Sequence, residues 1–267
     1  MTSYTCNYTD SMSTATGTTV HGDHFIPGRV SWPDLMRMNV KLVDKSLAIE
    51  RVLESGYYIM VALAPPGSGK STFLSMLAEY LALYSKVPRE TRLGYFGKYD
   101  LYTKRRGFFD EHFAKYPVIH LDFSPQTIED ASMRLRESVH DATSHIVDHL
   151  LASLKIPADE GHIGLYPTAS ARRRAIEHVA DLFGRLKSDS AYLHTANIFM
   201  ENLLATLHMC RGGNKSVVLI DELEKPIAYL QCLSDIPQGV RRGIISIYNT
   251  FYTSVFMVSC DLSTDCN

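Results

Sequence analysis

The segment APPGSGKST at 64–72 constrains the fold of this chain more than any other feature of its sequence. It fits the phosphate-loop pattern, with Ala64 in place of the leading glycine and Gly69-Lys70-Ser71 at the required spacing. An apolar, β-rich stretch, YYIMVALA at 57–64, precedes it, and apolar residues at helical spacing follow it up to Tyr84. A strand, a glycine turn and a helix are therefore predicted in that order.

The residue types in this loop suit a triphosphate. Glycines let the backbone approach a phosphate closely, with N–H groups pointing inward and the positive end of the next helix behind them. Lys70 would reach the β- and γ-phosphates, and the Ser71 hydroxyl would hold magnesium. We expect the nucleotide to be bound by Pro66, Gly67, Ser68, Gly69, Lys70, Ser71 and Thr72. The alternative is a glycine turn that only joins a strand to a helix.

A second motif, VVLIDE at 217–222, supports the first. Its four apolar residues indicate a buried parallel strand, and a buried strand that ends in two carboxylates is costly unless a cation or water meets them. Asp221 suits a magnesium-linked position, and Glu222 suits the catalytic base that orients the attacking water. Taken alone, the pair could be a solvated turn. Together the two motifs predict a site that binds a nucleoside triphosphate with Mg²⁺ and can hydrolyse it.

Composition narrows the class of protein. A chain of 267 residues with 45% apolar content is long enough for one sizeable α/β domain. A net charge of -2 gives no global field that would recruit nucleic acid or an anionic membrane. The five cysteines form no C-x-x-C pair, which favours reduced thiols inside the cell, in the cytoplasm or alternatively the nucleus. No apolar run approaches the length of a membrane span.

Strands separated by helices predict an α/β fold, a three-layer P-loop NTPase with a mainly parallel sheet and helices on both faces. The second strand is expected at 117–123 and a fourth at 255–259, after a helix from about Gln238 to Thr250. The predicted organisation is a Ser/Thr-rich tail at 1–25, a lead-in at 26–56, the NTPase domain at 57–262 with an excursion at 86–115 and a helical insertion at 128–211, and a tail at 263–267.

Histidines and a further carboxylate give weaker signals. His145 and His149 stand four apart on a predicted helix with Asp148 between them, but no third ligand is evident, so packing or solvation is favoured over a metal pair. His120 is expected to be a core residue of the second strand. Asp122 could point toward the nucleotide or cap a turn, and the sequence does not decide between them.

Four segments carry a resemblance to a known family: VDKS at 43–46, YPVIHLDFS at 116–124, VVLIDELEKPI at 217–227 and VFMVS at 255–259. Over residues 33–262 the chain resembles the AAA-ATPase-like family, P-loop proteins of the additional-strand, catalytic-glutamate division. The resemblance implies a sheet order of 5-1-4-3-2. The loop departs from the arginine-rich form frequent in that family, and no sequence for the fifth strand is found before Asn267. We therefore expect a C-terminally truncated member, or a lead-in whose extended segment from Val40 to Lys45 covers the strand at 57–64.

The resemblance also implies residue roles. Ser259, or Asp261, would be the polar sensor at the end of the fourth strand, and we count Ser259 with Glu222 and Lys70 as a catalytic candidate. Arg241 and Arg242 are candidates for an arginine finger or are solvated helix residues. The roles of the motif residues Asp44 and Lys45 stay open, with an approach to the base or ribose as one reading.

The predicted function is magnesium-dependent ATP hydrolysis coupled to a conformational switch. A nucleotide-binding scaffold with slow or no turnover is the main alternative, and a small-molecule kinase is a weaker one. A GTPase is disfavoured because the one Asn-Lys pair, Asn214-Lys215, lacks the rest of the N-K-x-D element. Besides the nucleotide, an unidentified protein partner is left open, and an exposed sheet edge predicts self-association or poor solubility.

Overall fold

The structure is a computed structural model that describes residues 30–40, 42–57, 59–123, 131–155, 168–188, 195–210, 215–231 and 236–261. The predicted tails at 1–25 and 263–267 lie outside these residues. The helices before the first strand are α1 (Trp32–Arg37), α2 (Leu47–Glu54), α3 (Lys70–Leu81), α4 (Arg89–Phe96), α5 (Asp100–Lys104) and α6 (Arg106–His112). The later elements are β1 (Val118–Asp122), α7 (Ala131–Ser153), α8 (Ala169–Ser188), α9 (Thr195–Cys210), β2 (Val217–Asp221), α10 (Lys225–Gln231) and α11 (Gln238–Asp261).

β1 and β2 form a parallel pair whose register joins Val118 to Val217 and Asp122 to Asp221. Both strands stand where the apolar runs at 117–123 and 217–221 predict them, so these two predictions are confirmed. Because side chains alternate between the two faces of a strand, Ile119 and Leu121 enter one hydrophobic core while Val118 enters another. The pair therefore separates two cores.

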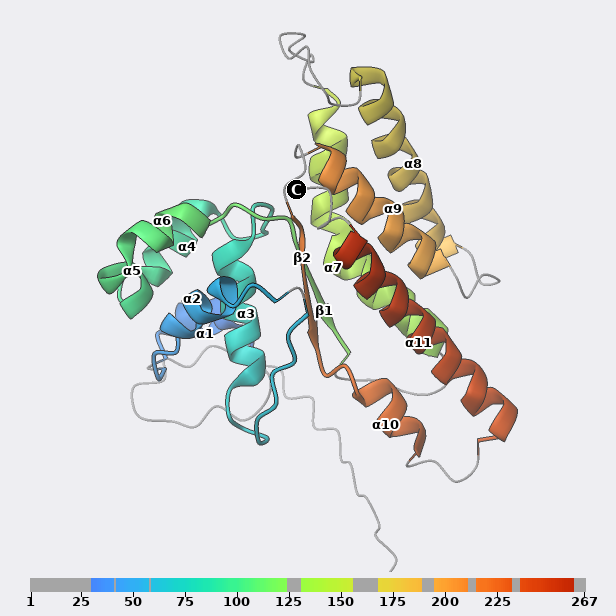
Figure 1. Cartoon of the computed structure of the whole chain (residues 1–267), viewed down its shortest axis with the longest axis horizontal. Coiled ribbons are helices and arrows are strands. Elements are labelled where there is room, and N and C mark those ends of the chain that lie inside the picture. The colour runs from blue at the N-terminus through green and yellow to red at the C-terminus, as the bar shows by residue number, and fades with distance from the viewer. Residues whose placement is uncertain are drawn as a thin grey trace, which may run out of the picture.

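Helices cover both faces of this pair (Figure 1). α3 packs on one face, with α1, α2 and the short helices α4 to α6 beyond it, and α7 and α11 lie on the other face with α8 and α9. The helical pattern expected at 128–211 corresponds to α7, α8 and α9, and the excursion expected at 86–115 corresponds to α4, α5 and α6. Of the helices that the structure describes, none is long and apolar enough to cross a bilayer.

Two predicted strands are wrong. Residues 59–64 are irregular and exposed, with Leu63 90% and Val61 72% accessible, and residues 255–259 lie within helix α11. The buried residues of α11 recur at helical spacing, namely Ile244, Ile247, Tyr248, Phe251, Tyr252 and Val255. An apolar run as short as VFMVS cannot be told from a buried helix segment by its periodicity alone.

The two missing strands would be neighbours in the sheet order 5-1-4-3-2 that the family resemblance implies, in which the fourth strand lies between β2 and the strand at 57–64. A lone extended segment has no ladder to hold it. The lead-in does not replace it, because residues 42–45 are also irregular. The predicted pairing of Val40 to Lys45 with the strand at 57–64 is therefore not formed. The described residues give an α/β arrangement with two parallel strands, and the predicted three-layer domain with a mainly parallel sheet is not confirmed.

Candidate phosphate site

The glycine turn ahead of α3 has the conformation that its residues predict. Gly67 has a φ of 76° and Gly69 a φ of 82°, both in the left-handed region that favours glycine. Gly69 is the N-cap of α3, and its carbonyl oxygen accepts a hydrogen bond of 2.9 Å from the Phe73 N–H. A Cβ added to Gly67 would meet no atom within 4 Å. The turn therefore presents its backbone, and the positive end of a helix, on a side that is open for a ligand.

Two lysines fold over this turn. Lys70 Nζ donates to the carbonyl oxygens of Ala64 and Pro65 at 2.6 and 3.1 Å. Lys45 Nζ, from the lead-in, donates to the carbonyl oxygen of Ser68 at 2.5 Å. Both ammonium groups thus lie on one short segment of chain. They give the turn a concentration of positive charge, although the net charge of the chain is -2.

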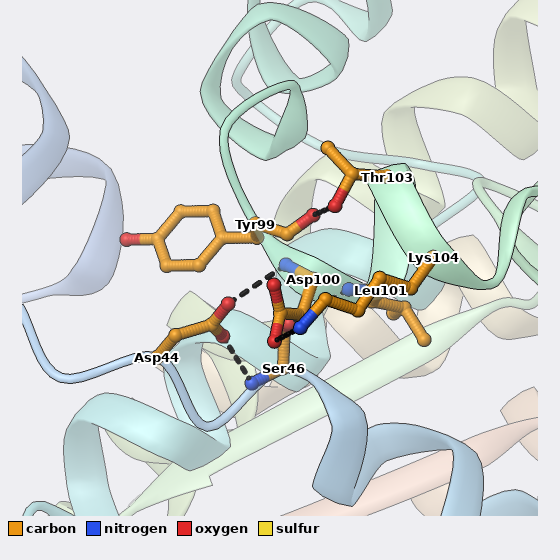
Figure 2. A network of polar contacts seen from close by, with 7 residues as sticks. All are labelled: Asp44, Ser46, Tyr99, Asp100, Leu101, Thr103 and Lys104. Carbon is orange, nitrogen blue, oxygen red and sulfur yellow. Dashed lines mark hydrogen bonds and ion pairs between the residues drawn. The ribbon is translucent and has the colours of Figure 1, made fainter.

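The VDKS segment of the lead-in bonds to the phosphate loop and to helix α5. The Asp44 carboxylate accepts hydrogen bonds of 2.7 Å from the N–H groups of Ser46 and Asp100, and the Ser46 hydroxyl accepts one of 3.0 Å from the Leu101 N–H. Figure 2 shows these side chains converging on the first turn of α5. Asp44 and Ser46 therefore bind N–H groups that a helix start leaves unpaired. In this structure Asp44 holds α5, and Lys45 bonds to the phosphate loop.

Trp32 anchors the wall behind the turn. Ser31 caps α1, and the Trp32 N–H donates to the Ser75 hydroxyl of α3 at 3.0 Å. The Trp32 ring is fully buried and packs against Phe96 and Tyr99, with centroid distances of 4.6 and 6.0 Å. Neither Trp32 nor Tyr99 belongs to a motif that the sequence shows. Their one sequence signal is that Trp32 is the only tryptophan in the chain.

The acidic pair stands at the end of β2, as predicted. Asp221 is the last residue of the strand and is 8% exposed. Glu222, the next residue, has a φ of 56°, which is uncommon for a residue other than glycine, asparagine or aspartate. Its carboxylate lies 3.8 Å from Lys225 Nζ. A non-glycine residue held in this region costs free energy, and such strain concentrates at functional sites.

α3 links the two halves of the candidate site. It packs against both β1 and β2, and its N-terminal end and the C-terminal ends of both strands face the same, lower side of the molecule in Figure 1. Ser71 lies half-buried in the first turn of α3. Asp122, at the end of β1 and in register with Asp221, is exposed. The fold thus brings the phosphate loop and the strand-end carboxylates to one end of the same sheet.

Other predicted residues lie elsewhere. Ser259 and Asp261 belong to the last turns of α11 and do not end a strand, so the position on which their sensor role depends is not formed. Arg241 and Arg242 lie in the first two turns of α11.

The predicted histidines lie in helix α7 and strand β1. His145 is partly buried in α7, while His149 lies on the same helix with its ring 4.5 Å from that of Tyr84, which supports packing. His120 is half-buried in the middle of β1. Within the part of the chain that the structure describes, no group of three or more His, Cys, Asp or Glu side chains could hold a metal ion.

Comparison with known proteins gives one match. The model of the AAA-ATPase-like family, described as predicted AAA-ATPases, matches residues 28–262. No curated protein and no solved structure matches the chain. The family match spans the lead-in, the phosphate loop, the acidic strand end and α11.

Proposed function

We propose, from the premise that this chain belongs to the AAA-ATPase-like family, that it binds ATP with magnesium and hydrolyses it to drive a conformational switch. One observation carries the proposal. A glycine turn with two left-handed glycines and two lysines opens the helix that packs on β2, the strand that ends in Asp221 and Glu222. A turn that only connected two elements would need neither the lysines nor the acidic strand end.

Each residue has a role in the proposal. The backbone N–H groups of residues 67–72, which follow Pro66, would hold the phosphates. Lys70 would exchange its two carbonyl partners for oxygens of the β- and γ-phosphates. Ser71 and Asp221 would hold magnesium, which neutralises phosphate charge when bound. Glu222 would orient and polarise the attacking water, because it follows the buried strand directly.

The conformational switch is proposed for the segment ahead of the loop. Lys70 bonds the carbonyl oxygens of Ala64 and Pro65. A bound phosphate would compete with these two carbonyl oxygens for the Lys70 ammonium group, which holds the segment in place. Residues 59–64 expose large apolar side chains, among them Ile59, Val61 and Leu63. Exposed apolar surface of this kind favours any second arrangement that buries it. Nucleotide binding and the position of 59–64 would therefore be coupled.

A nucleotide-binding scaffold with slow or no turnover is the second candidate. The observation that favours it is the helical state of 255–259, because Ser259 then has no strand end from which to contact the γ-phosphate or the attacking water. A small-molecule kinase is a weaker alternative, since phosphoryl transfer to an acceptor would not require Glu222 to activate water.

The test is magnesium-dependent phosphate release from ATP and from GTP by the purified protein, with affinity measured in parallel. Lys70→Ala should weaken binding of Mg-bound ATP at least tenfold, about 1.4 kcal/mol or more. Lys86→Ala, which alters an exposed lysine outside the loop, is the matched control and should bind as the parent does. Binding without phosphate release would favour the scaffold. Equal affinity in the parent and Lys70→Ala proteins would exclude the phosphate-loop function.

A further inference from the structure

A hollow lies against the glycine turn on the side of the lead-in. Its volume is about 290 Å³, and Gly67, Ser68 and Gly69 form one of its walls. Lead-in residues that include Leu42 also line it, together with the aromatic side chains of Trp32, Phe73 and Tyr99. This volume lies just below the usual range for drug-sized ligands, and it is large enough for a single heterocycle.

Charge in this hollow is confined to the boundary with the phosphate loop. Of the described residues that line it, Lys45 alone is charged, and its Nζ bonds the Ser68 carbonyl. The neighbours of Lys45 in the chain, Asp44 and Ser46, are fixed to the first turn of α5 (Figure 2). The VDKS segment therefore holds a cation where an apolar hollow meets an anion-binding turn.

Two polar atoms in the lining lack partners. The indole Nε1 of Trp32 and the hydroxyl of Ser68 are buried and make no hydrogen bond among the described residues. A buried donor without an acceptor is unfavourable, and a ligand that carries an acceptor would relieve the cost.

We infer that this hollow receives the base of the nucleotide whose phosphates occupy the glycine turn, with Lys45 placed between base and phosphates. The inference rests on the proposed function. A purine suits the hollow because it combines a flat apolar face, which packs on aromatic and aliphatic walls, with ring nitrogens that accept hydrogen bonds. A nucleoside joined to phosphates in the turn must lie beside that turn, and the hollow is contiguous with it.

The experiment uses the single tryptophan as a reporter. The full chain is titrated with ATP and with inorganic triphosphate, both with magnesium, and with adenosine, while Trp32 fluorescence is followed. Competition against a fluorescent ATP analogue gives the affinity of each probe independently. ATP and adenosine should change the fluorescence saturably. Triphosphate should compete with ATP but leave most of the fluorescence unchanged.

A pair of variants separates the base from the phosphates. Leu42 lines the hollow, whereas Leu53 packs equally at the edge of the same core without lining it. Leu42→Ala should weaken ATP binding about three- to tenfold and leave triphosphate affinity as it was, while Leu53→Ala should change neither. The melting temperature of each variant checks its fold.

The outcomes separate this inference from the proposed function. Suppose that ATP binding depends on Lys70, but Leu42→Ala either weakens ATP and triphosphate binding equally or changes neither affinity. The base then lies outside the hollow, and the proposed phosphate site is retained. If ATP binds but leaves Trp32 fluorescence unchanged, the base likewise lies outside the hollow. If neither ATP nor triphosphate binds, both proposals are overturned.

Discussion

Lys45 Nζ donates a hydrogen bond to the carbonyl oxygen of Ser68, and this contact joins the lead-in to the phosphate loop. The residues on either side of Lys45 bind the first turn of α5 through Asp44 and Ser46. A short motif therefore connects the candidate nucleotide site to a helix of the excursion. Because each contact is made by a different residue of the motif, their contributions can be separated by substitution.

Ser46→Ala should lower the free energy of unfolding by about 1–3 kcal/mol, because it leaves the buried Leu101 N–H without its acceptor. Thr103→Ala is the matched control: Thr103 is an exposed residue whose hydroxyl bonds the nearby Tyr99 carbonyl, so a loss within about 0.5 kcal/mol is expected. Urea denaturation measures both. Equal losses in the two variants would show that the Ser46 contact does not hold α5.

Glu222→Gln should preserve ATP affinity and lower turnover about a hundredfold or more, because a general base acts on the transition state and not on ground-state binding. Glu224→Gln, an exposed carboxylate two residues away, should retain parental turnover. Single-turnover phosphate release measures the chemical step. A Glu222→Gln protein that hydrolyses ATP at the parental rate would assign Glu222 to the turn alone.

Glu222→Gly tests the backbone strain at the same position. The left-handed φ of 56° costs a non-glycine residue about 1–2 kcal/mol, so glycine should raise the free energy of unfolding while turnover falls. Chemical denaturation checks the first effect and phosphate release the second. A loss of stability would mean that the Glu222 side chain contributes more than the strain costs.

Leu63→Lys should change the free energy of unfolding by no more than about 0.5 kcal/mol, since this side chain is 90% exposed and buries little surface. It should also reduce self-association in sedimentation experiments, because it breaks an exposed apolar run. Leu219→Lys, in buried β2, is the positive control and should be strongly destabilising. A comparably large loss in Leu63→Lys would place 57–64 inside a sheet.

Acidification should destabilise the chain in part through His145. Burial, and next the positive charge of Lys86, lower the pKa of His145 below its usual 6.5, against the opposing effects of the Tyr84 backbone and Asp148. A histidine with a lowered folded-state pKa contributes stability above its unfolded pKa, and this is lost as the pH falls through the folded value. His145→Gln should therefore lose less stability than the parent between about pH 7.5 and pH 5. Chemical denaturation of both proteins across this pH range measures the difference, and equal slopes would contradict the role given to His145.

Local sequence patterns were sufficient for much of this molecule. The glycine turn and α3 follow from Gly67, Gly69 and the apolar spacing after Lys70, because turn and helix contacts are made between near neighbours in the chain. β1 and β2 were equally predictable, since their apolar runs are short, bounded and followed by carboxylates. The position of Asp221 and Glu222 at a strand end follows directly from that pattern.

Tertiary structure decided what local patterns leave open. A strand exists only if a neighbour pairs with it, and residues 255–259, the neighbour expected for 57–64, belong to helix α11 with its buried apolar stripe. The same holds for Asp44, whose partner Asp100 is far away in the chain, and for Trp32, whose neighbours come from α3, α4 and the N-cap of α5. Contacts between residues distant in sequence are set by packing and by the pairing of buried polar groups, and no local periodicity encodes them.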